Sequence, residues 1–357
     1  MTIGRHLSLC LLLLLLCGCG GTTTKRYQAE FLGLFDTVTT IVGYSDNEAN
    51  FQEFAEEVRT QLQEYHQLYD IYNDYEGITN IKTINDHAGK APVQVDKRII
   101  DLLKFARAQY EATDGTVNVA MGAVLRIWHD YRAAGLEDPE KAELPPMELL
   151  MQASKHTNIA DVIIDEEDST VFLRDPAMRL DVGAIAKGYA AEQVMNHLES
   201  QGVTSLLLSL GGNIKAIGEK AAADPAKDKH WVIGIRNPDT SSPQNEILKV
   251  RIKGLSVVSS GSYQRYYTVD GVQYHHIIDP KTLMPTDNGF AQVTVLCRDS
   301  GLADSLSTAV YNMPLDKGRA YVESLDGVEA AWVMKDGSIE YSSGFQSYIQ
   351  DEAKAGR

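Results

Sequence analysis

The second half of the chain is a series of short apolar strands joined by turns, and this pattern limits the possible folds most strongly. Two of the turns are Asp-Gly pairs, Asp270-Gly271 and Asp336-Gly337. Such a pair favours the tight turn of a β-hairpin, which joins antiparallel neighbours. The expected strands after residue 160 include 162–164, 171–173, 204–210, 214–218, 231–236, 247–252, 256–260, 266–269, 272–278 and 290–297. Because hairpins outnumber strand–helix–strand units, we predict an α+β fold with a largely antiparallel or mixed sheet flanked by helices.

Most of the predicted helices lie in the first half. Apolar residues at helical spacing predict helices over 50–72, from Asp96 onward, over 124–131 and over 148–155. Residues 31–44 alternate and predict one strand with a bend near Gly33. Within the third helix, Trp128 is expected to pack in the core and His129 to lie at the surface. Polar, proline-containing residues 135–147 predict an inserted loop.

The N-terminus has the pattern of an exported lipoprotein. The apolar run Leu7–Leu16 is too short for a membrane-spanning helix but suits a signal peptide. It is followed by Cys17-Gly18-Cys19, which resembles a bacterial lipoprotein box with Cys19 as the lipid-bearing residue. An ordinary secretion signal is the alternative, and Cys17 is the weaker lipidation candidate because the bulky Leu16 precedes it.

These features predict a signal peptide at 1–18, a lipidated Cys19 with a flexible tether at 19–28, and one domain at 29–350. The protein would be anchored by a lipid, such as palmitate, to the extracytoplasmic face of the cell membrane. Cys297 would then be the one cysteine of the folded body, and its alternation with Val293 and Val295 is typical of inert packing. The net charge of -16 argues against a nucleic-acid partner.

The stretch Asp181–Ala191 places a carboxylate, two glycines and a lysine where an extended segment becomes a helix. Met178, Leu180 and Val182 alternate, which predicts a strand, and helical spacing starts at Ala184. Free N–H groups at a helix start attract anions, and glycines let a ligand approach the main chain. The simpler interpretation is a strand–turn–helix junction with a surface lysine and a capping aspartate.

Three further stretches carry candidate chemistry. Asp304 and Thr308 lie one helical turn apart, and a carboxylate with a hydroxyl suits Mg²⁺; the alternative is a solvated Asp and a Thr bonded to its own helix. In His275-His276, neighbouring strand residues face opposite sides, so one histidine at most enters a given pocket. Ser209–Asn213 is a glycine turn that a ligand could approach. Tyr72, at the end of the first helix, would stack on a planar ring or simply pack.

Several common active-site motifs are missing. The chain has no GxGxxG after a strand and no GxxxxGK[ST] loop, so neither a Rossmann nor a P-loop nucleotide site is indicated. It also lacks GxSxG and HExxH, which weakens the case for a hydrolase with a nucleophile elbow or a zinc protease. An acidic exported protein with anion-binding turns and a Mg²⁺-type pair still indicates phosphate chemistry.

In combination, these stretches resemble the ApbE family of flavin transferases, many of which are bacterial lipoproteins. The resemblance runs from about Phe31 to near Ser343. Its strongest stretches are Asp181–Ala190 (DVGAIAKGYA), Ser209–Asn213 (SLGGN), Trp231–Pro238 (WVIGIRNP), Ser260–Tyr267, His275–Pro280 (HHIIDP) and Asp304–Ala309 (DSLSTA).

The resemblance implies cleavage of the FAD pyrophosphate and transfer of FMN to a Thr or Ser hydroxyl of an acceptor protein, with release of AMP. It matches Ala184, Asp304 and Thr308 to the Mg²⁺ positions of the family, with Ala184 acting through its carbonyl. The positions matched to FAD contacts are Tyr72, Thr116, Val117, Asn118, Asp181, Lys187 and Ile278. His276 matches the general base, which would take the proton of the acceptor hydroxyl while AMP leaves.

The chain departs from the family pattern at two places. Thr116-Val117-Asn118 stands where many members have an Ala-Phe-Asp type run, so a carboxylate is lost and the FAD contact there is in doubt. The loop from Gly135 to Pro146 resembles a feature of a subgroup.

The family resemblance leaves other functions open. An FAD pyrophosphatase would use the same groups with water as acceptor, and a non-enzymatic lipoprotein would only bind flavin. If the chain is a transferase, the expected partners are FAD and an acceptor flavoprotein, either a subunit of a membrane redox complex or a secreted protein.

Overall fold

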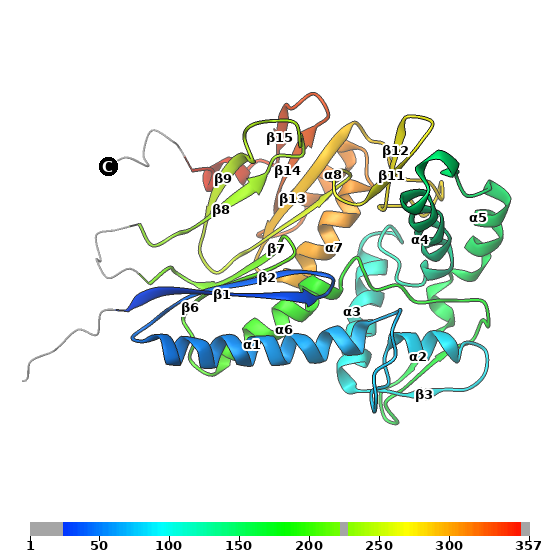
Figure 1. The fold of residues 1–357 in the computed structure, drawn as a ribbon, viewed down its shortest axis with the longest axis horizontal. Helices are drawn as coiled ribbons and strands as arrows, with labels where there is room; N and C mark the ends of the chain where they lie inside the picture. Colours follow the sequence, from blue (N-terminus) through cyan, green and yellow to red (C-terminus); the bar gives the residue numbers. More distant parts are fainter. Residues whose placement is uncertain (1–23, 222–227, 351–357) are drawn as a thin grey trace, which may run out of the picture.

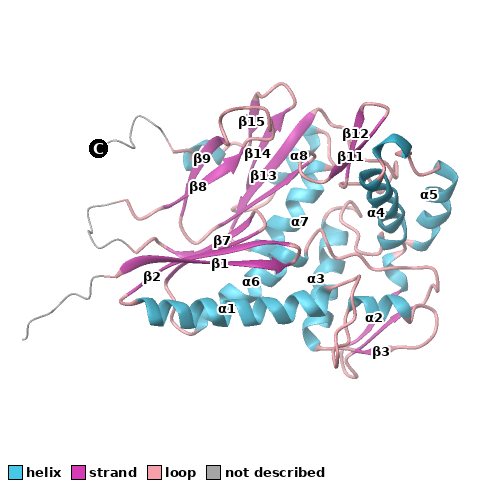
Figure 2. Ribbon diagram, in the orientation of Figure 1, coloured by secondary structure: helices cyan, strands magenta, loops and turns pink. Residues whose placement is uncertain are grey.

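The computed structural model describes residues 24–221 and 228–350 (Figures 1 and 2). The α-helices are α1 Glu48–Tyr69, α2 Ile81–Asp86, α3 Lys97–Ala112, α4 Gly122–Glu137, α5 Met147–Ala153, α6 Ala186–Ser200, α7 Ser300–Tyr311 and α8 Leu315–Glu323. The strands are β1 Lys25–Leu34, β2 Thr37–Ser45, β3 Val93–Gln94, β4 Val162–Asp165, β5 Thr170–Leu173, β6 Ser205–Leu210, β7 Asn213–Gly218, β8 Trp231–Arg236, β9 Glu246–Ile252, β10 Ser256–Gly261, β11 Tyr266–Val269, β12 Val272–His275, β13 Phe290–Cys297, β14 Glu329–Met334 and β15 Ile339–Tyr341.

An eight-stranded sheet forms the centre of the fold, in the order β1-β2-β6-β7-β10-β13-β14-β15. Each neighbouring pair in this sheet is antiparallel. The α+β fold predicted from the hairpin pattern is therefore confirmed. None of the helices in the described ranges is both long enough and apolar enough to span a bilayer.

Both faces of the large sheet contribute side chains to buried cores, and successive side chains of a strand point to opposite faces. Ile41 packs with α1 and α6 in one core, whereas its neighbour Val42 packs with the β8–β9 hairpin in another. In the same way Val258 faces α7 and α8, and Val257 faces the hairpin. The helices thus cover one face of the sheet and the hairpin covers part of the other (Figure 2).

The segment predicted as a single strand over 31–44 is a hairpin. The chain reverses at Phe35 and Asp36, which have φ angles of 50° and 54°, and β1 pairs with β2 on either side. Two non-glycine residues rarely adopt this left-handed conformation, so the sequence lacks the usual sign of a hairpin turn. Because β1 begins at Lys25, the last four residues of the predicted tether lie in this strand.

The extended segment before α6 does not join a sheet as predicted. Met178, Leu180 and Val182 are buried as their alternation indicates. The backbone of Leu180, however, bonds to a side chain: its N–H donates to Asn85 Oδ1 at 2.7 Å, and its C=O accepts from Asn85 Nδ2 at 3.0 Å. Asn85, from α2, thus takes the place of a neighbouring strand on one side of the segment, and on the other side the backbone of the segment bonds to Val119 and Gly122 in an isolated parallel bridge.

Replacing Asn85 with Ala should therefore destabilise the segment that leads into α6. The change leaves the N–H and C=O of Leu180 buried without partners, which we expect to cost about 2–4 kcal/mol of unfolding free energy. Urea unfolding of the Asn85→Ala variant measures this loss. A loss below about 0.5 kcal/mol would mean that water or another group replaces the amide.

Helix boundaries differ from the predictions by a few residues. Helix α1 ends at Tyr69, because the carboxylate of Asp70 accepts the N–H groups of Tyr72 and Asn73. Helix α4 continues to Glu137, which shortens the predicted inserted loop. Helix α7 is capped by Asp299, whose side chain accepts the N–H of Leu302.

Candidate functional site

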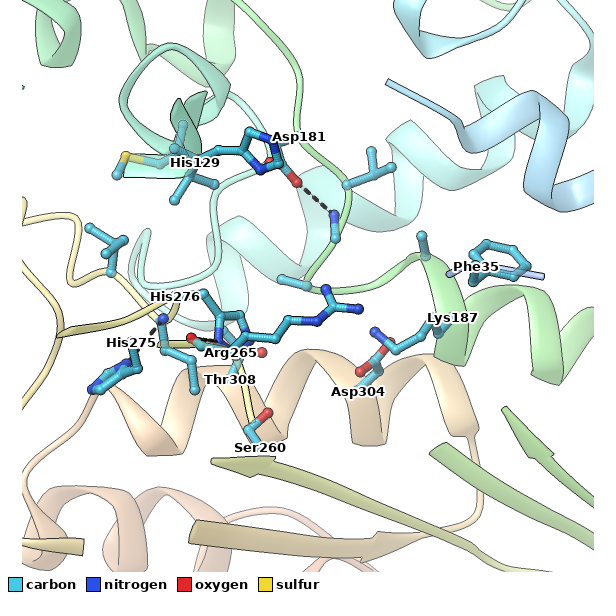
Figure 3. A pocket seen from close by; sticks show the side chains of 18 of the residues that line it. Phe35, His129, Asp181, Lys187, Ser260, Arg265, His275, His276, Asp304 and Thr308 are labelled. Carbon is cyan, nitrogen blue, oxygen red and sulfur yellow. Dashed lines mark hydrogen bonds between the residues drawn. The ribbon is translucent and has the colours of Figure 1, made fainter. Parts of the chain in front are cut away.

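A cavity of 390 Å³ lies between three parts of the fold. These are the helices that cover the large sheet, the β1–β2 turn, and the small separate core formed by α4 with the β11–β12 hairpin. Its wall includes each residue that the sequence assigned to catalysis, metal or FAD: Tyr72, Thr116, Val117, Asn118, Asp181, Ala184, Lys187, His276, Ile278, Asp304 and Thr308. These residues come from segments more than two hundred positions apart. Figure 3 shows several of them around the open centre of the cavity.

Asp304 is the most buried charged group of the cavity. Its residue is 5% exposed, and its Oδ2 accepts the backbone N–H of Gly188, from the first turn of α6, at 2.8 Å. Burial raises the pKa of Asp304, although the positive charge of Lys187 and the Gly188 N–H both lower it. A buried carboxylate with so few donors is stabilised by a nearby cation, so Asp304 fits the role of a metal ligand.

Gly188 has a different role from the one its sequence position suggested. A Cβ at this position would lie 2.3 Å from the Ser300 carbonyl oxygen and 2.5 Å from Asp304 Cβ. The absence of a side chain therefore brings α6 against α7, and does not open the main chain to a ligand. Gly183, in contrast, lines the cavity.

The two other predicted metal positions also suit Mg²⁺. Thr308 lies one turn after Asp304 on α7, and within the described ranges its hydroxyl does not bond to its own helix. Ala184 precedes α6 and lines the same cavity. Within the part of the chain that the structure describes, no three His, Cys, Asp or Glu side chains cluster around a metal position. A set of one carboxylate, one hydroxyl and one carbonyl is nevertheless typical of Mg²⁺, which keeps several water or phosphate ligands.

The hydrogen bonds of the two adjacent histidines distinguish their roles. His275 uses both ring nitrogens: Nε2 donates to the Thr286 carbonyl at 2.8 Å, and Nδ1 accepts the Ile277 N–H at 3.2 Å. His276 Nδ1 lies 3.2 Å from the Arg265 carbonyl, which can only accept, so Nδ1 carries the proton. The Nε2 atom of His276 therefore keeps its lone pair for a reactant.

The surroundings of His276 keep its imidazole neutral. The ring faces the cavity, but the surrounding walls remove much of the water that would stabilise its charged form. Arg265 and Arg132 add positive charge nearby. Together these effects hold the pKa of His276 well below its ordinary value of 6.5. At neutral pH the ring is available to accept a proton.

Asp181 and His129 lie on the wall of the cavity that faces Asp304 and Thr308 (Figure 3). Asp181 Oδ1 accepts the Gly183 N–H at 2.9 Å, and burial raises the pKa of Asp181 against the nearby charge of Lys187. The prediction that His129 lies at the surface is wrong, since its half-buried ring lines the cavity. Trp128 packs as expected, and its Nε1 donates to the Leu283 carbonyl at 2.9 Å.

The remaining predicted FAD contacts form the less polar part of the wall. The ring of Tyr72 is 52% exposed and lies 5.1 Å from that of His129, at an interplanar angle of 33°. Ile278 and Val117 are buried and supply apolar surface. The amide of Asn118 is used within the protein, because it donates to the Thr157 carbonyl and accepts the Ala120 N–H.

Sequence reasoning assigned no role to two arginines of the cavity, Arg132 and Arg265. Arg132 follows His129 by three positions on α4, so a helical face that already includes Trp128 could have indicated it. Arg265 lies within Ser260–Tyr267, one of the stretches that carried the family resemblance. The pattern of the sequence did not show that both side chains would enter one cavity.

The cavity indicates the class of the protein, an enzyme that acts on phosphate groups: it combines a buried carboxylate, a neutral histidine, and lysine and arginine charges without acidic partners among the described residues. The sequence pattern of the ApbE family matches residues 35–332. The chain belongs to the ApbE family, and the identification made from the sequence motifs is confirmed.

Individual relatives agree with this assignment. An FAD:protein FMN transferase from Klebsiella pneumoniae is 35% identical over 265 residues, which are 74% of this chain and 78% of that protein. One from Treponema pallidum is 32% identical over 348 residues, 95% of this chain and 94% of the relative. The crystal structure of the ApbE protein from Thermotoga maritima superposes with a TM-score of 0.76 at 30% identity, covering 92% of this chain and 100% of that one.

Proposed function

We propose that the chain is an FAD:protein FMN transferase, which moves FMN from FAD to a Thr or Ser hydroxyl of an acceptor protein and releases AMP. The observation that carries this proposal is the position of His276: its Nε2 is free in the same cavity that holds the buried Asp304. The names of the related proteins support the same activity.

We propose Mg²⁺ as the metal, and Asp304, Thr308 and the Ala184 carbonyl as the groups that would hold it. When bound, it would offset the negative charge of the FAD pyrophosphate. Lys187, at the start of α6, places a further positive charge beside Asp304 (Figure 3). The remaining chemistry belongs to the side chains of the protein.

The proton transfer falls to His276. A hydroxyl is a weak nucleophile unless a base takes its proton, and the neutral Nε2 of His276 is oriented for this by the Arg265 carbonyl. Tyr72, with His129 behind it, offers a flat aromatic surface on which the flavin ring would stack. Asp181 and the backbone of Thr116–Asn118 line the rest of the binding cavity.

The cavity also accounts for the competing functions. An FAD pyrophosphatase would need the same groups, with water in place of the acceptor hydroxyl at His276. A protein that only binds flavin would not need an imidazole whose free nitrogen faces the cavity. We therefore favour the transferase, and treat hydrolysis as a side reaction when no acceptor is present.

We further propose that the protein acts at the outer face of the cell membrane. Cys19 would carry the lipid, and the acceptor would be a membrane redox subunit or a secreted flavoprotein on the same side. Cys19 and the signal peptide lie outside the described residues. The support for this step is the sequence pattern at residues 1–19.

Separate substitutions of His276 and His275 test the proposed activity. The mature chain is incubated with FAD, Mg²⁺ and a candidate acceptor, and the intact mass of the acceptor and the release of AMP are measured. We expect a gain of one FMN, which His276→Ala lowers by about 10²–10⁴-fold. His275→Gln should keep most of the activity, since His275 uses its nitrogens for structure. AMP with free FMN for every acceptor tested would favour the pyrophosphatase, and FAD binding without AMP would leave only a binder.

A further inference from the structure

Arg132 and Arg265 are two cations of the cavity that lack acidic partners. In residues 24–221 and 228–350, neither guanidinium forms an ion pair, whereas Arg98, Arg251 and several others do. Among the described residues, the Arg132 side chain makes one polar contact, with a ring nitrogen of His129 at 3.3 Å. In a chain with 49 acidic residues, unpaired arginines in a cavity indicate a site for an anion from outside the protein.

The two guanidinium groups act on the same part of the cavity. Burial and the positive charge of Arg265 lower the pKa of Arg132, so the two charges repel each other. The positive charge of both arginines also lowers the pKa of His276 and opposes the rise that burial causes in the pKa of Tyr72. An anion placed between the arginines would remove this repulsion.

Arg265 spans the distance between the base and the metal ligands. Its backbone carbonyl holds His276, and its side chain extends across the open centre of the cavity toward Lys187 and Asp304 (Figure 3). In the proposed reaction, the phosphorus that is attacked lies within reach of both a hydroxyl at His276 and Asp304, which would hold the metal. The guanidinium therefore lies where this phosphate has to bind.

The charge balance of the transfer gives Arg265 a task. The hydroxyl oxygen forms a bond to the FMN phosphorus, and its proton goes to His276. The bond from that phosphorus to the bridging oxygen breaks, and the electron pair leaves on AMP. The two negative charges of the pyrophosphate become one on the new phosphodiester and two on AMP, so the phosphate groups gain one negative charge.

We propose that Arg265, with Arg132 beside it, binds the transferred phosphate of FAD and stabilises the negative charge that gathers on its oxygens in the transition state, before the electron pair leaves on AMP. This makes Arg265 a further catalytic residue, and the inference rests on the proposed transferase function. A guanidinium suits this position because its planar fork of N–H donors matches two phosphate oxygens, which a lysine does not. A preorganised donor in a cavity contributes more than one in water.

The test compares Arg265→Gln, Arg265→Lys and Arg132→Gln with Arg126→Gln, a control on α4 whose side chain is exposed and pairs only with Asp130. Single-turnover AMP release is measured with and without acceptor, and FAD affinity by flavin fluorescence. We expect Arg265→Gln to slow AMP release by about 10²–10³-fold in both reactions, with a smaller loss for Arg132→Gln. Arg265→Lys should recover part of the rate, and Arg126→Gln should resemble the parent chain.

Two results would overturn the inference. If the Gln variants release AMP at the parent rate and only the KM for the acceptor rises, the arginines bind a carboxylate of the acceptor. If the rate of AMP release and the KM for the acceptor both stay at the parent values, in variants whose melting temperature is also unchanged, the arginines bind no reactant. A parent chain that binds FAD but releases no AMP would instead disprove the proposed function itself.

Discussion

Asp304→Asn should abolish most of the metal-dependent activity while leaving the protein folded. The amide has the shape of the carboxylate. Its oxygen can still accept the Gly188 N–H, which in the parent chain donates to Asp304 Oδ2 at 2.8 Å. It lacks the negative charge that a hard divalent cation requires. Because a metal contributes several kcal/mol to such a reaction, we expect FAD cleavage to fall by about 10³-fold or more.

The stability of this variant provides an independent readout. Burial raises the pKa of Asp304 in the folded chain above its ordinary value. A carboxyl with a raised folded pKa destabilises the native state at every pH above its unfolded pKa, since the unfolded chain ionises more easily. Without metal, Asp304→Asn should therefore melt at the same temperature as the parent or higher, which is the opposite of an ordinary core mutation.

Mg²⁺ should then stabilise the parent chain but not the variant. At a hundred times its dissociation constant, a ligand that binds only the native state adds about 2.7 kcal/mol. The matched control is Asp299→Asn, at the start of the same helix, where asparagine keeps the helix cap. If Asp304→Asn still shows the Mg²⁺-dependent rise in melting temperature, the metal does not bind at Asp304.

The hairpins at Asp270-Gly271 and Asp336-Gly337 could be predicted because their turns are encoded locally. The β1–β2 hairpin could not, because Phe35 and Asp36 turn the chain without glycine or asparagine. Leu180 illustrates a second limit. Its alternation with neighbours showed correctly that it is buried, but the group that bonds to its backbone, Asn85, lies 95 residues away.

The same limit applies to the candidate site. The residue types of the cavity were found from short motifs and the family resemblance. The pattern of the His-His pair did not show which ring is free, since that depends on the carbonyls of Thr286 and Arg265. Likewise Gly188 resembled a ligand-binding glycine, and only the packing of α6 on α7 shows that it accommodates Ser300 and Asp304.

The packing of α6 against α7 depends on a buried ion pair. Of the substitutions proposed for this protein, the one that breaks this ion pair should lower the free energy of unfolding most. Lys215, from β7, lies 3.0 Å from Glu192 Oε2 and donates to the Arg298 carbonyl at 2.5 Å. Glu192, from α6, also accepts the N–H of Ser300, the first residue of α7, at 2.7 Å. Both side chains are less than 10% exposed.

Glu192→Ala should cost about 3–5 kcal/mol of unfolding free energy, because it leaves Lys215 as a buried charge without its partner. The double variant Glu192→Leu, Lys215→Met should lose less, about 1–3 kcal/mol, since an apolar pair of similar volume often replaces a buried ion pair at little cost, whereas the Ser300 N–H still loses its acceptor. Urea unfolding of the single and double variants measures both losses and their coupling. A loss below about 1 kcal/mol for Glu192→Ala would mean that water reaches Lys215.

The double variant also separates stability from function. It restores the buried packing, but it removes the carboxylate that holds the N–H of Ser300 at the start of α7. That helix carries Asp304, and the N–H of Gly188 on α6 holds the Asp304 carboxylate. We therefore expect the double variant to be stable and yet to need more Mg²⁺ for half-maximal FAD cleavage than the parent. An unchanged Mg²⁺ requirement would show that the Gly188–Asp304 bond alone keeps the two helices in register.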